Sequence, residues 1–152
     1  MVGGVNRIAG YHRAYEEYRA TPAFPYQDIT GKNDEESFSN IKAAILAQKP
    51  TAVFAISTSL SYITYEVLNE LKLKVPEDIS LLAFDDERWL ALMRISVIGH
   101  PTQALAASIV REILSYETAD GETYPSATSF KPFLVERQSV LPVRLPNDNA
   151  QP

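Results

Sequence analysis

Two groups of oxygen-bearing side chains directly follow apolar segments of the chain. Ser57-Thr58-Ser59 follows residues 51–56, and Asp85-Asp86-Glu87 follows residues 79–84. Hydroxyls and backbone amides at a helix start can bind an anion or another polar ligand. Plain N-capping is the structural alternative, since Ser and Thr are favoured at that position. The first group therefore indicates either ligand binding or helix capping.

The carboxylate of Asp85 has several possible uses. It can accept two hydrogen bonds from neighbouring hydroxyls of a sugar. Together with Asp86 and Glu87 it can instead bind a metal ion such as Mg²⁺, or take up a phosphoryl group. The structural alternative is an acidic turn that caps a helix or pairs with Arg88. The residues alone leave these uses open.

Arg7 is expected in the first turn of a helix that Asn6 caps. A cation is unfavourable there because of the helix dipole, so Arg7 needs a partner. A surface salt bridge, a ligand oxygen or Asp85 would each serve. The histidines at 12 and 100 lack the spacing of a zinc-binding helix, and no nucleophile elbow, P-loop or dinucleotide-binding glycine pattern occurs. We therefore expect no catalytic residues, no metal and no cofactor.

Length and composition restrict the class of protein. The 152 residues fit one domain with a substantial core, and 45% are hydrophobic. A net charge of −5 argues against a nucleic-acid-binding surface in this chain. The lack of cysteine excludes disulfides, thiolate metal ligands and a thiol nucleophile. With no signal-peptide pattern and no apolar run long enough to cross a bilayer, we expect a soluble, cytoplasmic domain.

Alternating helical and extended patterns predict the elements that position these groups. Helical stripes are expected around residues 6–18, 34–48, 57–71 and 102–116. Extended segments are expected at 26–29, 51–56, 79–84, 96–99, 130–137 and 139–141. The segments 51–56 and 79–84 are apolar on both faces, as in strands of covered parallel sheets. The pattern predicts a three-layer α/β fold, with a mainly parallel sheet flanked by helices.

Ligands in such folds gather beyond the carboxyl ends of the strands. That rule selects Ser57-Thr58-Ser59 and Asp85-Asp86 as the place for a site. It selects a location and does not identify the chemistry.

Three segments resemble the effector domain of the lactose/galactose-repressor family. They match in order along nearly the whole chain, from Arg7 to about Val140. The same module also occurs in arabinose-repressor-like regulators. The segments are RIAGY at 7–11, PTAVFA at 50–55 with VPEDISLLAFDD at 75–86, and PFLVERQS at 132–139.

The resemblance implies a periplasmic-binding-protein-like type I fold, in which two α/β lobes enclose a small ligand. Arg7 matches the arginine that binds ligand oxygens, and Asp85 matches the aspartate that accepts from ligand hydroxyls. Ser57 and Thr58 fall where the family usually has Asn-Asp or Ser-Asp, so Thr58 can bond a hydroxyl but carries no charge. His100 lies where relatives often have Gln, at a crossing between the lobes.

The resemblance also implies a dimer interface on this lobe. Tyr62, Tyr65 and Glu66 on the third helix would face a second copy of the chain. Trp89, Leu92 and Met93, which follow the acidic turn, would join them. From the residues alone, the apolar cluster at 89–93 is either core or a subunit contact, and its charged flanks favour contact.

By the same resemblance, residues 1–141 are the C-terminal lobe of an effector-binding domain, followed by a loose tail at 142–152. The DNA-binding head and most of the N-terminal lobe are expected to be absent. The helix that begins at Thr102 would pack largely in that missing lobe. Its stripe of Leu105, Ile109, Ile113 and Leu114 would then be partly uncovered unless another chain covers it.

The expected function is small-molecule sensing and dimerisation within a transcriptional repressor. The expected partners are a small effector, most simply a sugar, a second copy of the chain, and operator DNA through a head that this chain lacks; no membrane partner is expected. One alternative is a Mg²⁺-dependent enzyme or phosphotransfer domain that uses Asp85, Asp86 and Glu87. Another is a periplasmic-type sugar-binding protein of the same fold.

Overall fold

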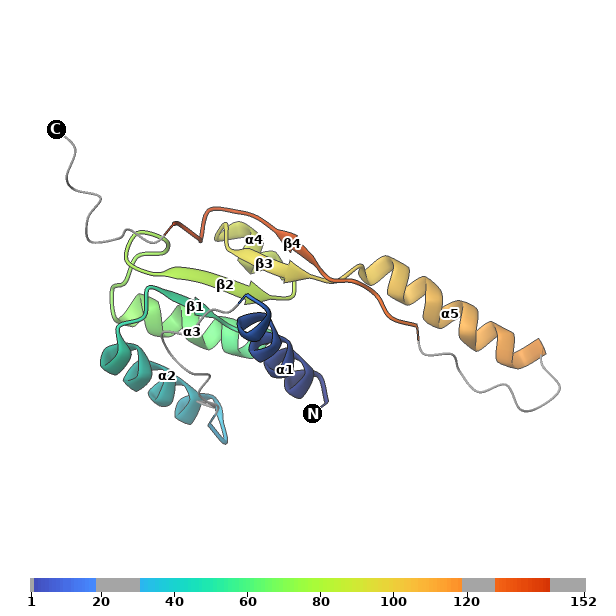
Figure 1. The fold of residues 1–152 in the computed structure, drawn as a ribbon, viewed down its shortest axis with the longest axis horizontal. Coiled ribbons are helices and arrows are strands. Elements are labelled where there is room, and N and C mark those ends of the chain that lie inside the picture. The colour runs from blue at the N-terminus through green and yellow to red at the C-terminus, as the bar shows by residue number, and fades with distance from the viewer. Residues whose placement is uncertain (1, 19–30, 119–127, 143–152) are drawn as a thin grey trace.

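The computed structural model describes residues 2–18, 31–118 and 128–142 (Figure 1). The extended segment expected at 26–29 and the tail beyond residue 142 lie outside these ranges. Helices and strands alternate along most of the described chain. In order they are α1 (Val2–Glu17), α2 (Asp34–Gln48), β1 (Ala52–Phe54), α3 (Thr58–Glu70), β2 (Ser80–Phe84), α4 (Arg88–Leu92), β3 (Ser96–Gly99), α5 (Thr102–Thr118) and β4 (Phe133–Val135).

The strands form one sheet in the order β1-β2-β3-β4. β1, β2 and β3 run parallel, with Val53 opposite Leu81 and Ala83 opposite Val97. β4 returns antiparallel to β3. This confirms the mainly parallel α/β sheet flanked by helices, and it brings the carboxyl ends of β1, β2 and β3 to the same edge.

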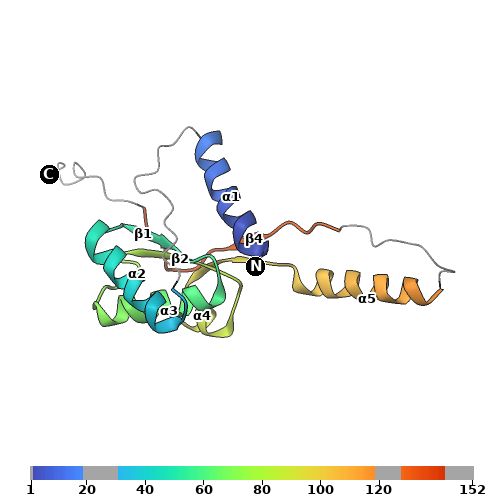
Figure 2. The ribbon, with the colours of Figure 1, turned by 90° about the horizontal axis from the view of Figure 1, so that it is seen from below.

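Helices lie on both sides of this sheet. α2 and α3 pack together on one face, while α1 lies on the opposite side (Figure 2). Val67 and Leu68 of α3 pack with Leu81 of β2 and Val97 of β3 in the core, and all four are fully buried. Such burial removes water from the apolar surface and provides the main stabilisation of the lobe.

The expectation that both apolar strands are covered on both faces is confirmed for β2 and wrong for β1. The residues of β2 are buried except for Leu82, which is half-buried. In β1, Ala52 is exposed and Phe54 keeps 38% of its surface in contact with solvent. The reason is that β1 is an edge strand in the described sheet, with a neighbour on one side only.

The helix starts show which capping signals were correctly interpreted. Ser57 is the N-cap of α3, and its side chain accepts from the Leu60 amide at 3.3 Å. α1 begins at Val2, so Asn6 is not its cap and Arg7 lies in the second turn. The short helix α4 was not predicted, because five residues are too few for a periodic pattern.

α5 projects away from the sheet in both ribbon views (Figures 1 and 2). Its stripe residues Leu105, Ile109, Ile113 and Leu114 are all exposed in this structure, and what covers them stays a prediction. Within the described ranges, no helix is long and apolar enough to span a membrane.

Candidate ligand-binding site

Asp85 lies where β2 ends and the chain turns away from the sheet. Its φ of 68° is in the left-handed region, which Asp tolerates better than most residues. Its backbone amide donates to the carbonyl of Ile98 in β3 at 2.9 Å, which extends the ladder by one residue. Backbone in this region is held by its surroundings and occurs often at binding sites.

Two side chains from other elements reach the Asp85 carboxylate. Thr58, the first residue of α3, donates its hydroxyl to Oδ2 at 3.2 Å. His100, directly after β3, places Nε2 at 3.3 Å from Oδ1. About a third of the Asp85 side chain stays accessible, 35% by area, so the carboxylate is both oriented and open to a ligand.

Arg7 joins the same edge of the sheet from α1. Its Nη1 donates to the carbonyl of Ile56 at 2.6 Å, just beyond β1. Its guanidinium carbon lies 3.6 Å from the centroid of the Phe84 ring, a cation–π arrangement. The partner of Arg7 is thus a carbonyl and a ring, not the surface carboxylate or the Asp85 contact considered from the sequence.

The Phe84 ring contacts the side chains of both Arg7 and His100. The His100 ring lies 4.9 Å from the Phe84 ring and is tilted by 60°. Arg7 and His100 therefore both contact the ring of Phe84, the residue directly before Asp85. Phe84 and the Ile56 carbonyl were not among the candidates, because an apolar strand residue and a backbone oxygen give no signal in the sequence.

Tyr11 follows Arg7 by one helical turn. Burial, and then a hydrogen bond with Tyr15, raises the pKa of Tyr11 to about 12. Its hydroxyl is therefore protonated at neutral pH, and its ring packs edge-on against Tyr15 at 4.8 Å. The residues 7, 11 and 15 share one face of α1.

Ser57 is close to this group, but its hydroxyl oxygen caps α3. The capping interpretation is confirmed for Ser57, and a ligand role for it stays a prediction. Four candidates, Arg7, Thr58, Asp85 and His100, are brought together from α1, the start of α3, the end of β2 and the end of β3.

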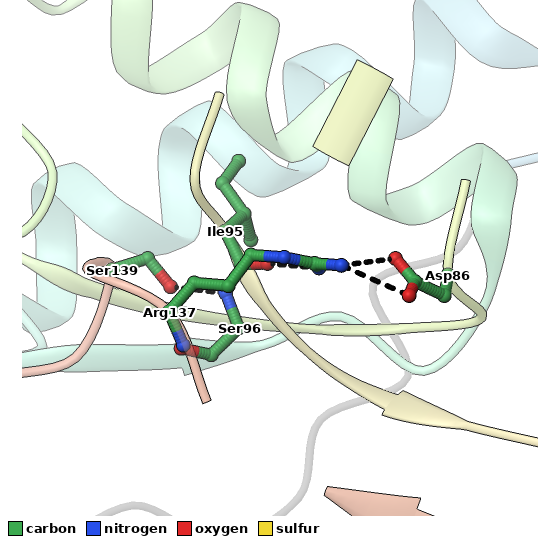
Figure 3. A network of polar contacts seen from close by, with 5 residues as sticks. All are labelled: Asp86, Ile95, Ser96, Arg137 and Ser139. Carbon is green, nitrogen blue, oxygen red and sulfur yellow. Dashed lines mark hydrogen bonds and ion pairs between the residues drawn. The ribbon is translucent and has the colours of Figure 1, made fainter. Parts of the chain in front are cut away.

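The neighbouring acids point to other partners. Asp86 forms a two-oxygen ion pair with Arg137, at 2.7 and 2.9 Å from Nη2 (Figure 3). Glu87 is exposed and makes no side-chain capping bond to α4. In the parts of the chain that are described, no three of His, Cys, Asp and Glu gather as metal ligands do. The arrangement that a Mg²⁺ site at Asp85, Asp86 and Glu87 requires is not formed. The partner found for Asp86 is Arg137, whereas the sequence had offered Arg88 as one alternative for the acidic turn.

The residues expected at a dimer interface form a surface group of their own. Trp89 contacts the rings of Tyr62 and Tyr65 edge-on, at 5.7 and 5.8 Å. Leu92 is 80% exposed beside them, and Met93 and Glu66 are exposed as well. The cluster at 89–93 is divided, because Leu90 enters the core while its neighbours stay at the surface.

A hollow of about 460 Å³ lies elsewhere, near the amino ends of β2 and β3. Its lining runs from Tyr65 through the 68–77 segment to Met93 and Ile95, and contains none of the ligand-binding candidates. This hollow is therefore separate from the group around Asp85, whose carboxylate is partly open to solvent.

Comparison with known proteins shows which family this chain belongs to. A family model described as "Periplasmic binding protein-like domain" matches residues 3–140. The "Probable opine utilization operon repressor" of Rhizobium rhizogenes is 28% identical over 138 residues, which are 88% of this chain and 69% of that protein. The "HTH-type transcriptional repressor PurR" of Edwardsiella ictaluri is 30% identical over 141 residues, which are 90% of this chain and 41% of that protein.

A solved structure shares the fold. The structure titled "transcriptional regulator CelR-cellobiose complex" superposes with a TM-score of 0.75 at 22% identity, over 92% of this chain and 43% of that one. The chain therefore spans less than half the length of two of these three relatives. Since the family model covers residues 3–140, this chain belongs to the periplasmic binding protein-like domain family, and its homologues include transcriptional repressors.

Proposed function

We propose that this chain is the sensing and dimerising portion of a transcriptional repressor, and that its site binds a small polar molecule, most simply a sugar. The observation that carries this proposal is the meeting of Arg7, Thr58, Asp85 and His100 at one edge of the sheet. Four separate segments supply them. Such convergence at the carboxyl ends of parallel strands is typical of ligand sites in α/β folds.

The chemistry of the group fits a ligand with hydroxyls and a further polar or anionic group. Asp85 has accessible oxygens that accept from hydroxyls or an amine. Arg7 has further N–H groups besides the one given to Ile56, and these can bind ligand oxygens in pairs. Asp85 is the one carboxylate among these four residues. Thr58, which donates to it, adds a hydroxyl to the group without a second negative charge.

The ligand would lie between this lobe and a second lobe supplied by the longer protein. We propose residues 1–141 as the C-terminal lobe, with operator DNA bound by a head outside this chain and the whole acting in the cytoplasm. A ligand that favours one closure angle would shift the population between DNA-competent and incompetent dimers. The names of the relatives support this arrangement, since they are repressors and one structure holds cellobiose.

The experiment is calorimetric titration of the full-length protein with cellobiose, glucose and octopine. These probes are chosen because one relative is complexed with cellobiose and another is named for opine utilisation. We expect saturable binding of at least one probe. Asp85→Ala should abolish that binding and the effector response while the dimer persists, because the accepting carboxylate is removed.

Glu87→Ala is the matched control, since it removes an exposed acid two residues away. It should bind as the unchanged protein does. Equal binding by the Asp85→Ala variant would remove Asp85 from the site. Binding of Mg²⁺ that quenches Trp89 fluorescence and fails in Asp85→Asn would favour the enzyme alternative instead.

A further inference from the structure

The segment that follows β4 is bonded across the sheet through two buried serines. Ser139 donates its hydroxyl to the Leu81 carbonyl at 2.6 Å and accepts from the Ser96 amide at 2.7 Å. The Arg137 amide in turn donates to the Ser96 hydroxyl at 2.9 Å (Figure 3). These bonds fix the backbone at residues 137–139 on β2 and β3. The Arg137 side chain extends from this fixed backbone.

The Arg137 guanidinium connects two further places. Nη1 donates to the Ile95 carbonyl at 2.8 Å, and Nη2 donates to both oxygens of Asp86. Only 17% of the Arg137 side chain is exposed, against 39% for Asp86. A charge-assisted pair with a partly buried, doubly anchored guanidinium holds its carboxylate more firmly than a flexible surface pair does.

Asp86 directly follows the residue that carries the site. Asp85 has φ 68°, a conformation in the left-handed region that Asp adopts more readily than most residues but that contacts on either side still have to hold. On the amino side, its own amide is bonded to the Ile98 carbonyl. On the carboxyl side, the Asp86–Arg137 ion pair holds the turn.

We propose that Arg137, acting through Asp86, is a positioning residue for the ligand-binding carboxylate of Asp85. The ion pair fixes the turn at 85–87 so that Asp85 meets Thr58 and His100 in an orientation open to the ligand. Arg137 itself does not contact the ligand. The ligand part of this inference rests on the proposed function, whereas the fixing of the turn does not.

The first test is hydrogen exchange of the full-length protein, followed by mass spectrometry without ligand. Asp86→Asn removes the charge and one acceptor. Arg137→Lys keeps the charge but not the fork that reaches Ile95 and Asp86 together. We expect both variants to speed amide exchange in the 84–88 peptide by tenfold or more, while Glu70→Gln, which breaks the exposed Lys42–Glu70 pair, leaves it unchanged.

Faster exchange confined to residues 137–141, or no change in either segment, would overturn the proposal, because the pair would then only fasten the chain after β4.

The second test repeats the titrations with cellobiose and octopine. Both variants should bind the active probe about tenfold more weakly, whereas Glu70→Gln should bind normally. Faster exchange at 84–88 with unchanged affinity would also overturn it. If no probe binds the unchanged protein, the proposed ligand class fails while the exchange result still decides whether the pair fixes the turn.

Discussion

His100 and Thr58 hold the Asp85 carboxylate from two sides, one oxygen each. A carboxylate with both oxygens engaged has fewer rotamers to lose when a ligand binds, so the ordering cost is met before binding. Arg7 is prepared in the same way, because Phe84 and the Ile56 carbonyl already restrict its guanidinium. At the scale of single residues, Asp85 and Arg7 are thus held in place by their neighbours before a ligand binds.

The His100 contact gives a direct prediction. His100→Leu removes a hydrogen-bonding group next to Asp85 and should weaken ligand binding about tenfold, near the lower end of the value for bonds to a charged group. His100→Gln keeps a donor and should retain most of the affinity. Calorimetric titration of both variants of the full-length protein checks this. Equal affinities in the Leu and Gln variants would mean that His100 does not orient the carboxylate.

Ser139 gives a prediction about stability. Ser139→Ala leaves the Ser96 amide and the Leu81 carbonyl in a buried place without their partner. The free energy of unfolding should fall by about 2–4 kcal/mol, since each buried unsatisfied group costs about 1–3 kcal/mol. Urea unfolding measures the change. Ser59→Ala, at an exposed position of α3, should alter the unfolding free energy little, and a similar loss in both variants would contradict the assigned role.

At the scale of elements, the candidate side chains come together because β1, β2 and β3 end at the same edge of the sheet. The position of this edge was predictable, because apolar strands followed by polar groups give a clear pattern at 57–59 and 85–86. The approach of His100 to it was expected only through the family resemblance, whereas for Arg7 the residues alone had offered Asp85 or a ligand oxygen as two of three possible partners. Spacing along one sequence cannot show which distant segments meet.

Other features were not predictable for physical reasons that the structure makes clear. β1 was expected to be covered on both faces, since its composition resembles that of β2, but among the described strands it lies at the sheet edge and two of its three residues are exposed. The pairing of Asp86 with Arg137 spans 51 positions, so the sequence could offer only a local alternative, Arg88. The second-turn position of Arg7 depends on where α1 begins, and helix boundaries are weakly specified by sequence.

α5 provides the prediction that belongs to this scale. Ile109 and Ile113 are 50% and 56% exposed, so changing both to Glu removes no core contact of the described lobe. The isolated chain should keep its thermal midpoint, and any self-association should decrease, because the exposed apolar stripe is interrupted. Light scattering after gel filtration, together with a melting curve, checks both. A large fall in the midpoint would show that the stripe is packed within one chain.

At the scale of the whole molecule, the lobe has two surfaces with different chemistry. One is the polar edge around Asp85; the other is the aromatic group of Tyr62, Tyr65 and Trp89 with exposed Leu92. Interfaces are enriched in such aromatic residues relative to the rest of a protein surface. The proposed assembly therefore uses different residues for the ligand and for the partner copy, although α3 contributes Thr58 to the first and Tyr62 and Tyr65 to the second.

The proposed dimer surface is tested with a matched pair of substitutions. Leu92→Glu places a charge in the aromatic group and should raise the dissociation constant of the full-length dimer by at least tenfold. Leu46→Glu, at a position on α2 that is 56% exposed, should leave it unchanged. Analytical ultracentrifugation measures both. Equal dissociation constants for the two variants would place the interface elsewhere.

The central claim is that Arg7, Thr58, Asp85 and His100 form one ligand site. Its most direct test is a crystal structure of the full-length protein with the probe that binds in calorimetry. We expect hydroxyl or amine groups of the ligand at about 2.7–3.0 Å from the Asp85 carboxylate, as in charge-assisted hydrogen bonds, and ligand oxygens within reach of Arg7. A ligand bound away from the carboxyl ends of β1, β2 and β3, with Asp85 contacting only Thr58 and His100, would contradict the account.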